Sequence, residues 1–138
     1  MKRVLIISAH TIKNDNRIIS ELDTLVSNGI ECGVISRGEK FQERGDIFQY
    51  CSRRKGVLGA LEFYFAVVKY IKKFRPTHIQ LCDADTLPVY WFIQKKRQYN
   101  WIYDAHELEF NRAGQSKLLG SCIYFLERIT LRSFNHII

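Results

Sequence analysis

The stretch "RVLIIS", residues 3–8, decides the fold class of this chain. It is a short apolar run rich in β-branched residues, and the polar connection "AHTIKND" follows it at residues 9–15. A run without apolar-polar alternation is typical of a strand that is buried on both faces. Such strands belong to parallel sheets covered by helices on both sides, so the stretch indicates an α/β protein.

Residues 15–28 predict the first helix. Apolar side chains recur there at helical spacing, Asn14 or Asp15 is available as the N-cap, and Gly29 follows as the stop. A second strand is expected at residues 31–36, followed by a charged surface loop at 37–46 and a short strand at 47–51. The apolar positions of the helix are Ile18, Ile19, Leu22, Leu25 and Val26.

The second half of the sequence continues the alternation of strands and helices. A long helix is expected from about Val57 to Phe74, where Pro76 forces a stop. Further strands are expected at residues 77–82, 100–105 and 136–138, with helices at 83–97, which has Pro88 in its first turn, and at 116–132. This order predicts a doubly wound parallel sheet whose ligands bind beyond the carboxyl ends of the strands.

Length and cysteine usage favour one domain in a reducing compartment. The chain has 138 residues, enough for a single domain with its own core. Its cysteines form no C-x-x-C pair, so we interpret them as free buried thiols and expect a cytoplasmic protein. The four cysteines are Cys32, Cys51, Cys82 and Cys122.

Charge and hydropathy restrict the partners. The longest lipophilic segment, residues 56–71, is interrupted by Glu62 and Lys69 and does not qualify as a membrane span. The formal charge of +7 makes an anionic partner plausible: nucleic acid, an acidic membrane surface or a phosphorylated substrate.

The segment "YDAHELEF", residues 103–110, is the first candidate site. Asp104, His106 and Glu107 follow a predicted strand, at the point where an acid, a base or a charge stabiliser would sit. The alternative is a turn at Asp104, a solvated His106 and acidic residues in a first helical turn. A metal site formed by Asp104, His106 and Glu109 is a weaker alternative, because no zinc-type spacing supports it.

Two further acids lie at the end of the neighbouring strand, in "CDADTLP", residues 82–88. One of Asp83, Asp85 and Thr86 is expected to cap the following helix. The remaining acid is available to accept a hydrogen bond from a sugar hydroxyl.

The start of the first helix supplies a cation in an unusual place. Arg17 lies near a helix N-terminus, where the helix dipole disfavours positive charge, so we expect it to have an anionic or carboxylate partner. No G-x-G-x-x-G or P-loop motif follows the first strand, which argues against dinucleotide or ATP binding.

The helix around residues 57–74 interleaves aromatic and basic residues. Most of the aromatic side chains are expected in the core and the lysines on a solvated face. The alternative is a helix that lies against an anionic bilayer, with rings at the interface and lysines on the headgroups. The residues concerned are Arg53, Arg54, Lys55, Phe63, Tyr64, Phe65, Lys69, Tyr70, Lys72, Lys73, Phe74 and Arg75.

Together, these stretches resemble the family-four retaining glycosyltransferases. The stretch "DNRIISELDTLVSNGIECGVIS" is similar to the opening of that family, and "HIQLCDADTLPVYWFIQKKRQYNWIYDAHELEF" is similar to its H-x-H-D-x-x-x-L-P and Y-D-x-H-E motifs. The resemblance covers essentially all of the chain. It implies a Rossmann-like domain, residues 1–138, that corresponds to the N-terminal, acceptor-binding half of a GT-B architecture.

The resemblance also implies roles for individual residues. His106 matches the histidine of the interdomain cleft near the donor sugar, and Glu107 belongs to the same catalytic motif. The positions that match the substrate-binding residues are Asp15, Arg17, Asp83, Asp85 and Asp104. The loop "AHTIKND" lacks the glycines of many family members, and His10 or Lys13 would have to substitute for their backbone donors.

The function implied is transfer of a sugar from a nucleotide-sugar to a glycan or lipid-linked acceptor, as in polysaccharide biosynthesis. We expect it to need no metal and no cofactor besides the donor, and no nucleic acid partner. The chain stops inside an apparent strand, so we expect it to continue into a donor-binding C-terminal domain and to be inactive alone. It would work in the cytoplasm, with peripheral attachment to an anionic membrane as one option.

Two alternatives remain open from the sequence. One is a stand-alone flavodoxin-like module that binds nucleic acid or a partner through its basic face. The other is a half-enzyme that recruits a separate donor-binding subunit.

Overall fold

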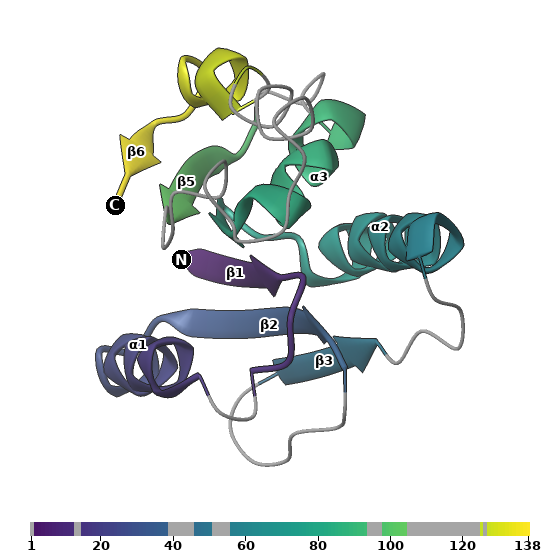
Figure 1. The fold of residues 1–138 in the computed structure, drawn as a ribbon. Helices are drawn as coiled ribbons and strands as arrows, with labels where there is room; N and C mark the ends of the chain where they lie inside the picture. The colour runs from purple at the N-terminus through teal and green to yellow at the C-terminus, as the bar shows by residue number, and fades with distance from the viewer. Residues whose placement is uncertain are drawn as a thin grey trace.

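The computed structural model describes residues 2–12, 15–38, 46–50, 56–93, 98–104, 125 and 127–138, and of 46–50 the backbone only. Strands and helices alternate along the chain (Figure 1). The elements are β1 (Arg3–Ser8), α1 (Asn16–Ser27), β2 (Glu31–Arg37), β3 (Asp46–Tyr50), α2 (Gly56–Phe74), β4 (His78–Cys82), the 3₁₀ turn η1 (Ala84–Thr86), α3 (Leu87–Ile93), β5 (Asn100–Asp104) and β6 (His136–Ile137).

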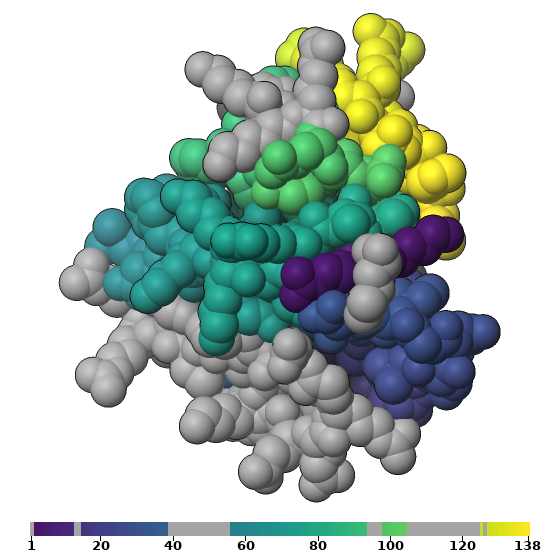
Figure 2. All heavy atoms as spheres, turned by 180° about the vertical axis from the view of Figure 1, so that it is seen from behind, coloured from purple at the N-terminus to yellow at the C-terminus, as the bar shows by residue number. Residues whose placement is uncertain are grey.

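The strands form one parallel sheet in the order β3-β2-β1-β4-β5-β6. β1 lies in its interior, with Ile6 opposite Val34 of β2 and Gln80 of β4. In the space-filling view the purple N-terminal residues accordingly lie between the blue and teal segments (Figure 2). The predicted α/β class with a doubly wound parallel sheet is confirmed.

Helices cover both faces of the sheet. One face of β1 and β2 packs against α1 through Ile18 and Leu22, and the other face packs against α2 and α3 through Phe63 and Val89. In Figure 1, α1 lies on the left and α2 and α3 on the right. The burial of β1 on both faces explains why the sequence shows no alternation there.

Local signals account for the boundaries of α1 and α2. The Asp15 carboxylate accepts hydrogen bonds from the backbone N–H groups of Arg17 and Ile18, so Asp15 is the N-cap. α2 ends at Phe74 ahead of Pro76, as predicted. Arg75, with φ 51°, turns the chain between them.

The expected helix at 83–97 begins differently from its prediction. Asp83 holds the cap position of η1 with φ 91°, and its side chain makes no capping hydrogen bond. The Thr86 hydroxyl instead donates to the Asp83 carbonyl at 2.7 Å. Of the three residues predicted as a possible side-chain cap, Asp83 does not act as one, because its left-handed backbone leads into a 3₁₀ turn rather than directly into an α-helix.

The end of the chain packs on the α3 side. Residues 125 and 127–131 are helical, within the helix expected at 116–132. Arg132 already lies in a turn, and residues 116–124 and 126 lie outside the description. Thr130 accepts a hydrogen bond from the Trp91 indole at 3.1 Å, and the Tyr103 hydroxyl donates to Glu127 at 2.8 Å. Among the described residues, no helix is both long and apolar enough to span a bilayer.

The thiols follow the expectation as far as they are described. Cys32 and Cys82 are free and buried. Cys51 and Cys122 lie outside the described residues.

Candidate functional site

The sheet changes winding direction between β1 and β4. From β1 the chain builds outward through β2 and β3, and it then returns to place β4 on the opposite side of β1. The connections that leave the carboxyl ends of β1 and β4 lead to α1 and α3, on opposite faces of the sheet. In open α/β sheets such a divergence opens a crevice in which ligands bind.

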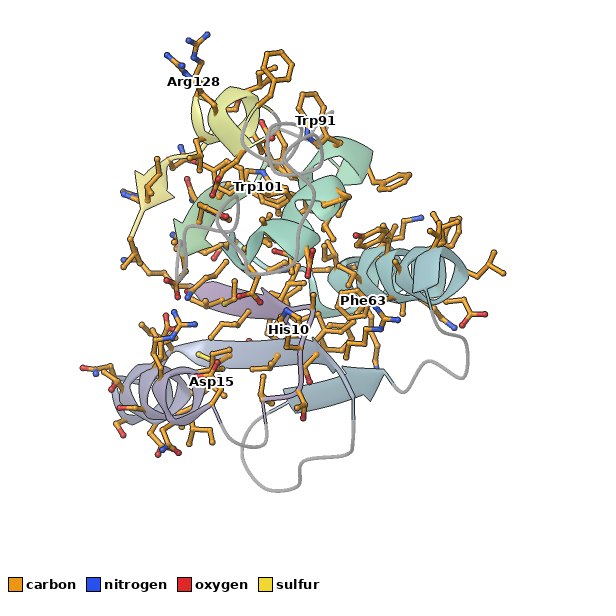
Figure 3. The ribbon with its side chains drawn as sticks, in the orientation of Figure 1. His10, Asp15, Phe63, Trp91, Trp101 and Arg128 are labelled. Atoms are coloured by element: carbon orange, nitrogen blue, oxygen red, sulfur yellow. The ribbon has the colours of Figure 1, made fainter. Side chains whose placement is uncertain are left out.

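A pocket of about 460 Å³ lies at this switch point, and we call it the switch-point pocket. Three segments that follow strands meet in it, together with the first half of α2. Figure 3 shows His10 near the middle of the molecule, beyond the end of β1. The lining residues are Ala9, His10, Thr11, Arg37, Gly38, Ala60, Phe63, Tyr64 and Asp85.

His10 and Asp85 face each other across the two diverging connections. The His10 Nε2 atom lies 3.6 Å from the Asp85 carboxylate, and each side chain is 51% exposed. The Ser8 hydroxyl oxygen accepts from the His10 backbone N–H at 3.3 Å, and the Tyr64 hydroxyl donates to the Asp85 carbonyl at 2.9 Å. The backbone at both positions is therefore held in place, and the side chains stay accessible to a ligand.

Gly38 allows the loop after β1 to approach the end of β2. Its φ is +129°, and a Cβ atom there would lie 2.9 Å from the Cβ of Thr11. A side chain at this position would push the β1 loop away from β2. Gly38 therefore fixes the width of the pocket on the side that also holds Arg37.

A second polar cluster lies on the face covered by α1. The Arg17 guanidinium donates to the Asp104 carboxylate, and the Gln80 amide donates to Glu21 at 3.0 Å and to Asp104 at 3.4 Å. We call these four residues the α1–β5 cluster. They line a second pocket, of about 660 Å³.

Burial sets the electrostatics of this cluster. Desolvation raises the pKa of the Glu21 carboxyl, the hydrogen bond from Gln80 lowers it, and the charge of Asp104 raises it further. The Asp104 side chain is 10% exposed, so its charge depends on Arg17 for compensation. The expected carboxylate partner of Arg17 is therefore Asp104.

The structure divides the predicted site residues between two places. Asp85 lines the switch-point pocket, whereas Arg17 and Asp104 line the second pocket. Asp15 caps α1 and its carboxylate lies 3.9 Å from Arg17. Asp83 occupies the turn before η1.

The two predicted catalytic residues, His106 and Glu107, lie outside the described residues, as does Glu109 of the alternative metal site. Among the residues that are described, no group of three or more His, Cys, Asp or Glu side chains could hold a metal ion.

His10 is the site residue that sequence reasoning undervalued. The sequence indicated His10 only as a substitute for glycine backbone donors, although it lies two residues after the end of the interior strand β1. The available signal was its position: the residues after β1 and after β4 border the switch point in any doubly wound sheet.

Comparisons with solved structures find related folds at low sequence identity. Sucrose-phosphate synthase from Thermosynechococcus elongatus has a TM-score of 0.75 at 14% identity, over 99% of this chain and 42% of that protein. MurG from Acinetobacter baumannii has a TM-score of 0.64 at 11% identity, over 99% and 40%. UDP-GlcNAc 2-epimerase from Methanocaldococcus jannaschii has a TM-score of 0.59 at 13% identity, over 96% and 42%.

Neither a scan against protein-family models nor a search of curated proteins finds a match. The chain spans about two fifths of the length of each of these three solved proteins. At such low identity the likeness concerns the fold. The chain has a Rossmann-like fold, like that of one half of a GT-B architecture.

Proposed function

We propose that this chain is the acceptor-binding half of a retaining glycosyltransferase of the family-four type. It would transfer a sugar from a nucleotide-sugar to a glycan or lipid-linked acceptor, with a donor-binding domain that this sequence does not contain. The observation that carries the proposal is the pocket formed by His10, Arg37 and Asp85 at the switch point of a sheet of this fold.

The side chains of the switch-point pocket suit a polyol. A carboxylate such as Asp85 accepts hydrogen bonds from sugar hydroxyls, whereas Arg37 donates and His10 can do either. The ring of Tyr64 and the methyl of Ala60, which are both partly exposed, add apolar surface for the face of a sugar ring. We assign acceptor binding to this pocket.

The proposed chemistry is that of a closing, metal-independent cleft. His106 and Glu107 would act on the donor sugar, with His106 orienting or polarising it, and the second domain would stabilise the leaving phosphates. In this scheme Asp15, Arg17 and Asp104 support the segment that carries His106, because Asp104 precedes it by two residues.

Glycan binding tests the acceptor assignment directly. The chain is titrated with a panel of mono- and oligosaccharides, and binding is followed by saturation-transfer NMR. Asp85→Asn and His10→Ala should each weaken binding about tenfold or more, since each removes a polar contact made in a partly desolvated pocket. The matched control is Asp23→Asn, a carboxylate on α1 outside the pocket lining, which should bind like the parent chain.

Three outcomes would count against the proposal. Sugar binding that is unaffected at Asp85 and His10 would remove the acceptor site. Salt-dependent binding of unrelated DNA, with no saccharide signal, would favour the basic binding module. In the polypeptide that includes the donor-binding domain, normal turnover after His106→Ala would remove the central catalytic assignment.

A further inference from the structure

The outward face of α2 exposes an apolar surface. Four side chains on the first turns of this helix are solvent-exposed: Val57 at 77%, Leu58 at 58%, Leu61 at 39% and Phe65 at 71%. The opposite face holds Phe63 in the core, and Figure 3 shows this ring between α2 and the sheet. The exposed residues are therefore not part of the packing that holds α2 in place.

Helix α3 extends this surface. Phe92 is 61% exposed, and its ring centroid lies 6.2 Å from that of Tyr64 on α2. We call the set formed by these residues the α2–α3 apolar patch: Val57, Leu58, Leu61, Phe65 and Phe92.

Lysines continue the same face of α2 toward its C-terminus. The series Leu61, Phe65, Lys69 and Lys72 has spacings of four, four and three residues. Such spacings place all four side chains on one side of a helix. Lys69, Lys72 and Lys73 are exposed. One helix side is thus apolar over its first half and basic over its second half.

This combination distinguishes between a protein partner and a bilayer. The cores of protein interfaces are depleted in lysine, because its flexible, strongly hydrated side chain is costly to order and desolvate. An interfacial helix on an anionic bilayer instead places its apolar side chains below the headgroups and its lysines on the phosphates. The formal charge of +7 adds attraction of the same sign.

We propose that the α2–α3 apolar patch, with Lys69, Lys72 and Lys73, docks this protein onto the surface of a bilayer that contains anionic lipids. Of the aromatic residues named in the sequence, Phe65 takes part in this contact, whereas Phe63, Tyr70 and Phe74 are buried in the core. The helix is held by its buried face before it meets the membrane, so docking does not have to fold it.

The docking surface has a consequence for the switch-point pocket. Ala60, Phe63 and Tyr64 line that pocket from the same turns of α2 whose other side carries Leu61 and Phe65. A helix is about 10–12 Å wide, so the pocket opens within roughly one helix diameter of the bilayer. This step rests on the proposed function and selects a lipid-linked acceptor over a free glycan.

Vesicle binding tests the docking surface without any donor or acceptor. The protein is sedimented with vesicles of phosphatidylcholine alone and with vesicles that contain phosphatidylglycerol as well. We expect binding to the mixed vesicles only. Phe65→Gln should weaken it about tenfold. Lys69→Gln/Lys72→Gln should weaken it about twenty-five-fold, since each lysine contributes roughly fivefold near an anionic surface.

The matched control variants replace an exposed apolar residue and two basic residues that lie outside the patch. Val26→Gln removes a side chain on α1 that is 50% exposed, and Arg128→Gln/Arg132→Gln lowers the net charge by the same two units on the C-terminal helical segment. In Figure 3, Arg128 points away from the rest of the molecule, at the opposite end of the view from α1. Both controls should retain nearly full binding.

Several results would overturn the proposal. Equal binding to neutral and mixed vesicles would show that the lysines do not contact anionic lipids. Control variants that bind vesicles as weakly as the patch variants would show that the patch is not the docking surface. A dimer in sedimentation-velocity experiments that Phe65→Gln dissociates, without vesicle binding, identifies a second copy of the chain as the occupant. Saccharide binding in the switch-point pocket is measured separately, so the failure of either proposal leaves the other intact.

Discussion

The Arg17 guanidinium, at the start of α1, donates to the carboxylate of Asp104, at the end of β5, and so joins two elements 87 residues apart. The contact spans the carboxyl edge of the sheet from the α1 face. It compensates a carboxylate that is almost fully buried and fixes the end of the strand from which residues 105–107 continue. The contact therefore stabilises the fold by fixing the carboxyl end of β5 against the start of α1.

Arg17→Met should lower the free energy of unfolding by about 2–3 kcal/mol, because it leaves the Asp104 charge without compensation. Asp104→Asn should cost less, since the amide still accepts from Gln80. The double variant should be more stable than the sum of the two losses predicts, by about 1 kcal/mol or more. Urea unfolding of all four proteins measures the coupling, and strictly additive losses would show that the pair contributes nothing.

Glu21→Gln should change the pH dependence of stability. Burial raises the pKa of Glu21 above its ordinary value of 4.5. Between pH 4.5 and the raised pKa, Glu21 therefore binds a proton in the folded chain more than in the unfolded chain. The parent chain should therefore gain stability relative to the variant as the pH falls from the raised pKa toward 4.5. At neutral pH the variant should be at least as stable, because its amide oxygen still accepts from Gln80.

The measurement for Glu21 is the difference in urea midpoint between the two proteins at several pH values. Every other titrating group is common to both proteins, so the difference isolates this carboxyl. A difference that stays constant between about pH 4 and about pH 7 would contradict the raised pKa.

Gly38→Ala should destabilise the chain by about 1–3 kcal/mol and weaken ligand binding in the switch-point pocket. The added Cβ meets Thr11 and the backbone has φ +129°, so the β1 loop has to move. Gly29→Ala is the matched control: its φ is +71°, and a Cβ there meets nothing within 4 Å. Thermal unfolding should show a smaller loss at Gly29, and equal losses would mean that the approach of Thr11 has no energetic consequence.

The buried thiols should be unreactive in the folded protein. Burial raises the pKa of Cys32 to about 11, and it raises the pKa of Cys82 as well, with a further contribution from Asp104. Since the thiolate is the reactive species, iodoacetamide at about pH 8 should label neither until urea unfolds the chain. Peptide mass spectrometry resolves the individual cysteines, and rapid labelling of Cys82 under native conditions would contradict its position in the core.

The sequence predicted the sheet well because its strands carry strong local signals. β1 is a short, mostly apolar run buried on both faces, and the stop before Pro76 follows from steric exclusion alone. The partner of Arg17 was predictable by type, because a cation at a helix N-terminus is unfavourable without a compensating charge. The identity of this partner was not predictable, because Asp104 comes close to Arg17 only through the order of the strands in the sheet.

The composition of the switch-point pocket was harder to predict. Asp85 was expected at the binding edge, but its pairing with His10 depends on the divergence of two connections on opposite faces of the sheet. The sequence could not exclude Asp83 as a helix cap, because helical patterns do not distinguish an α-helical start from a 3₁₀ turn. The periodicity of the sequence indicated the buried face of α2 only approximately, because apolar residues lie on both faces of this helix.

The interior position of β1 affects the order in which the newly made protein can fold. β2 is synthesised soon after β1, but the Arg3 backbone N–H finds its partner in Thr77, 74 residues further along the chain. At a synthesis rate of roughly 5–20 residues per second, one edge of β1 stays unpaired for about 4–15 s. During that time the ribosome-bound chain presents an open apolar strand edge, and such an edge is available to pair with other strands until β4 covers it.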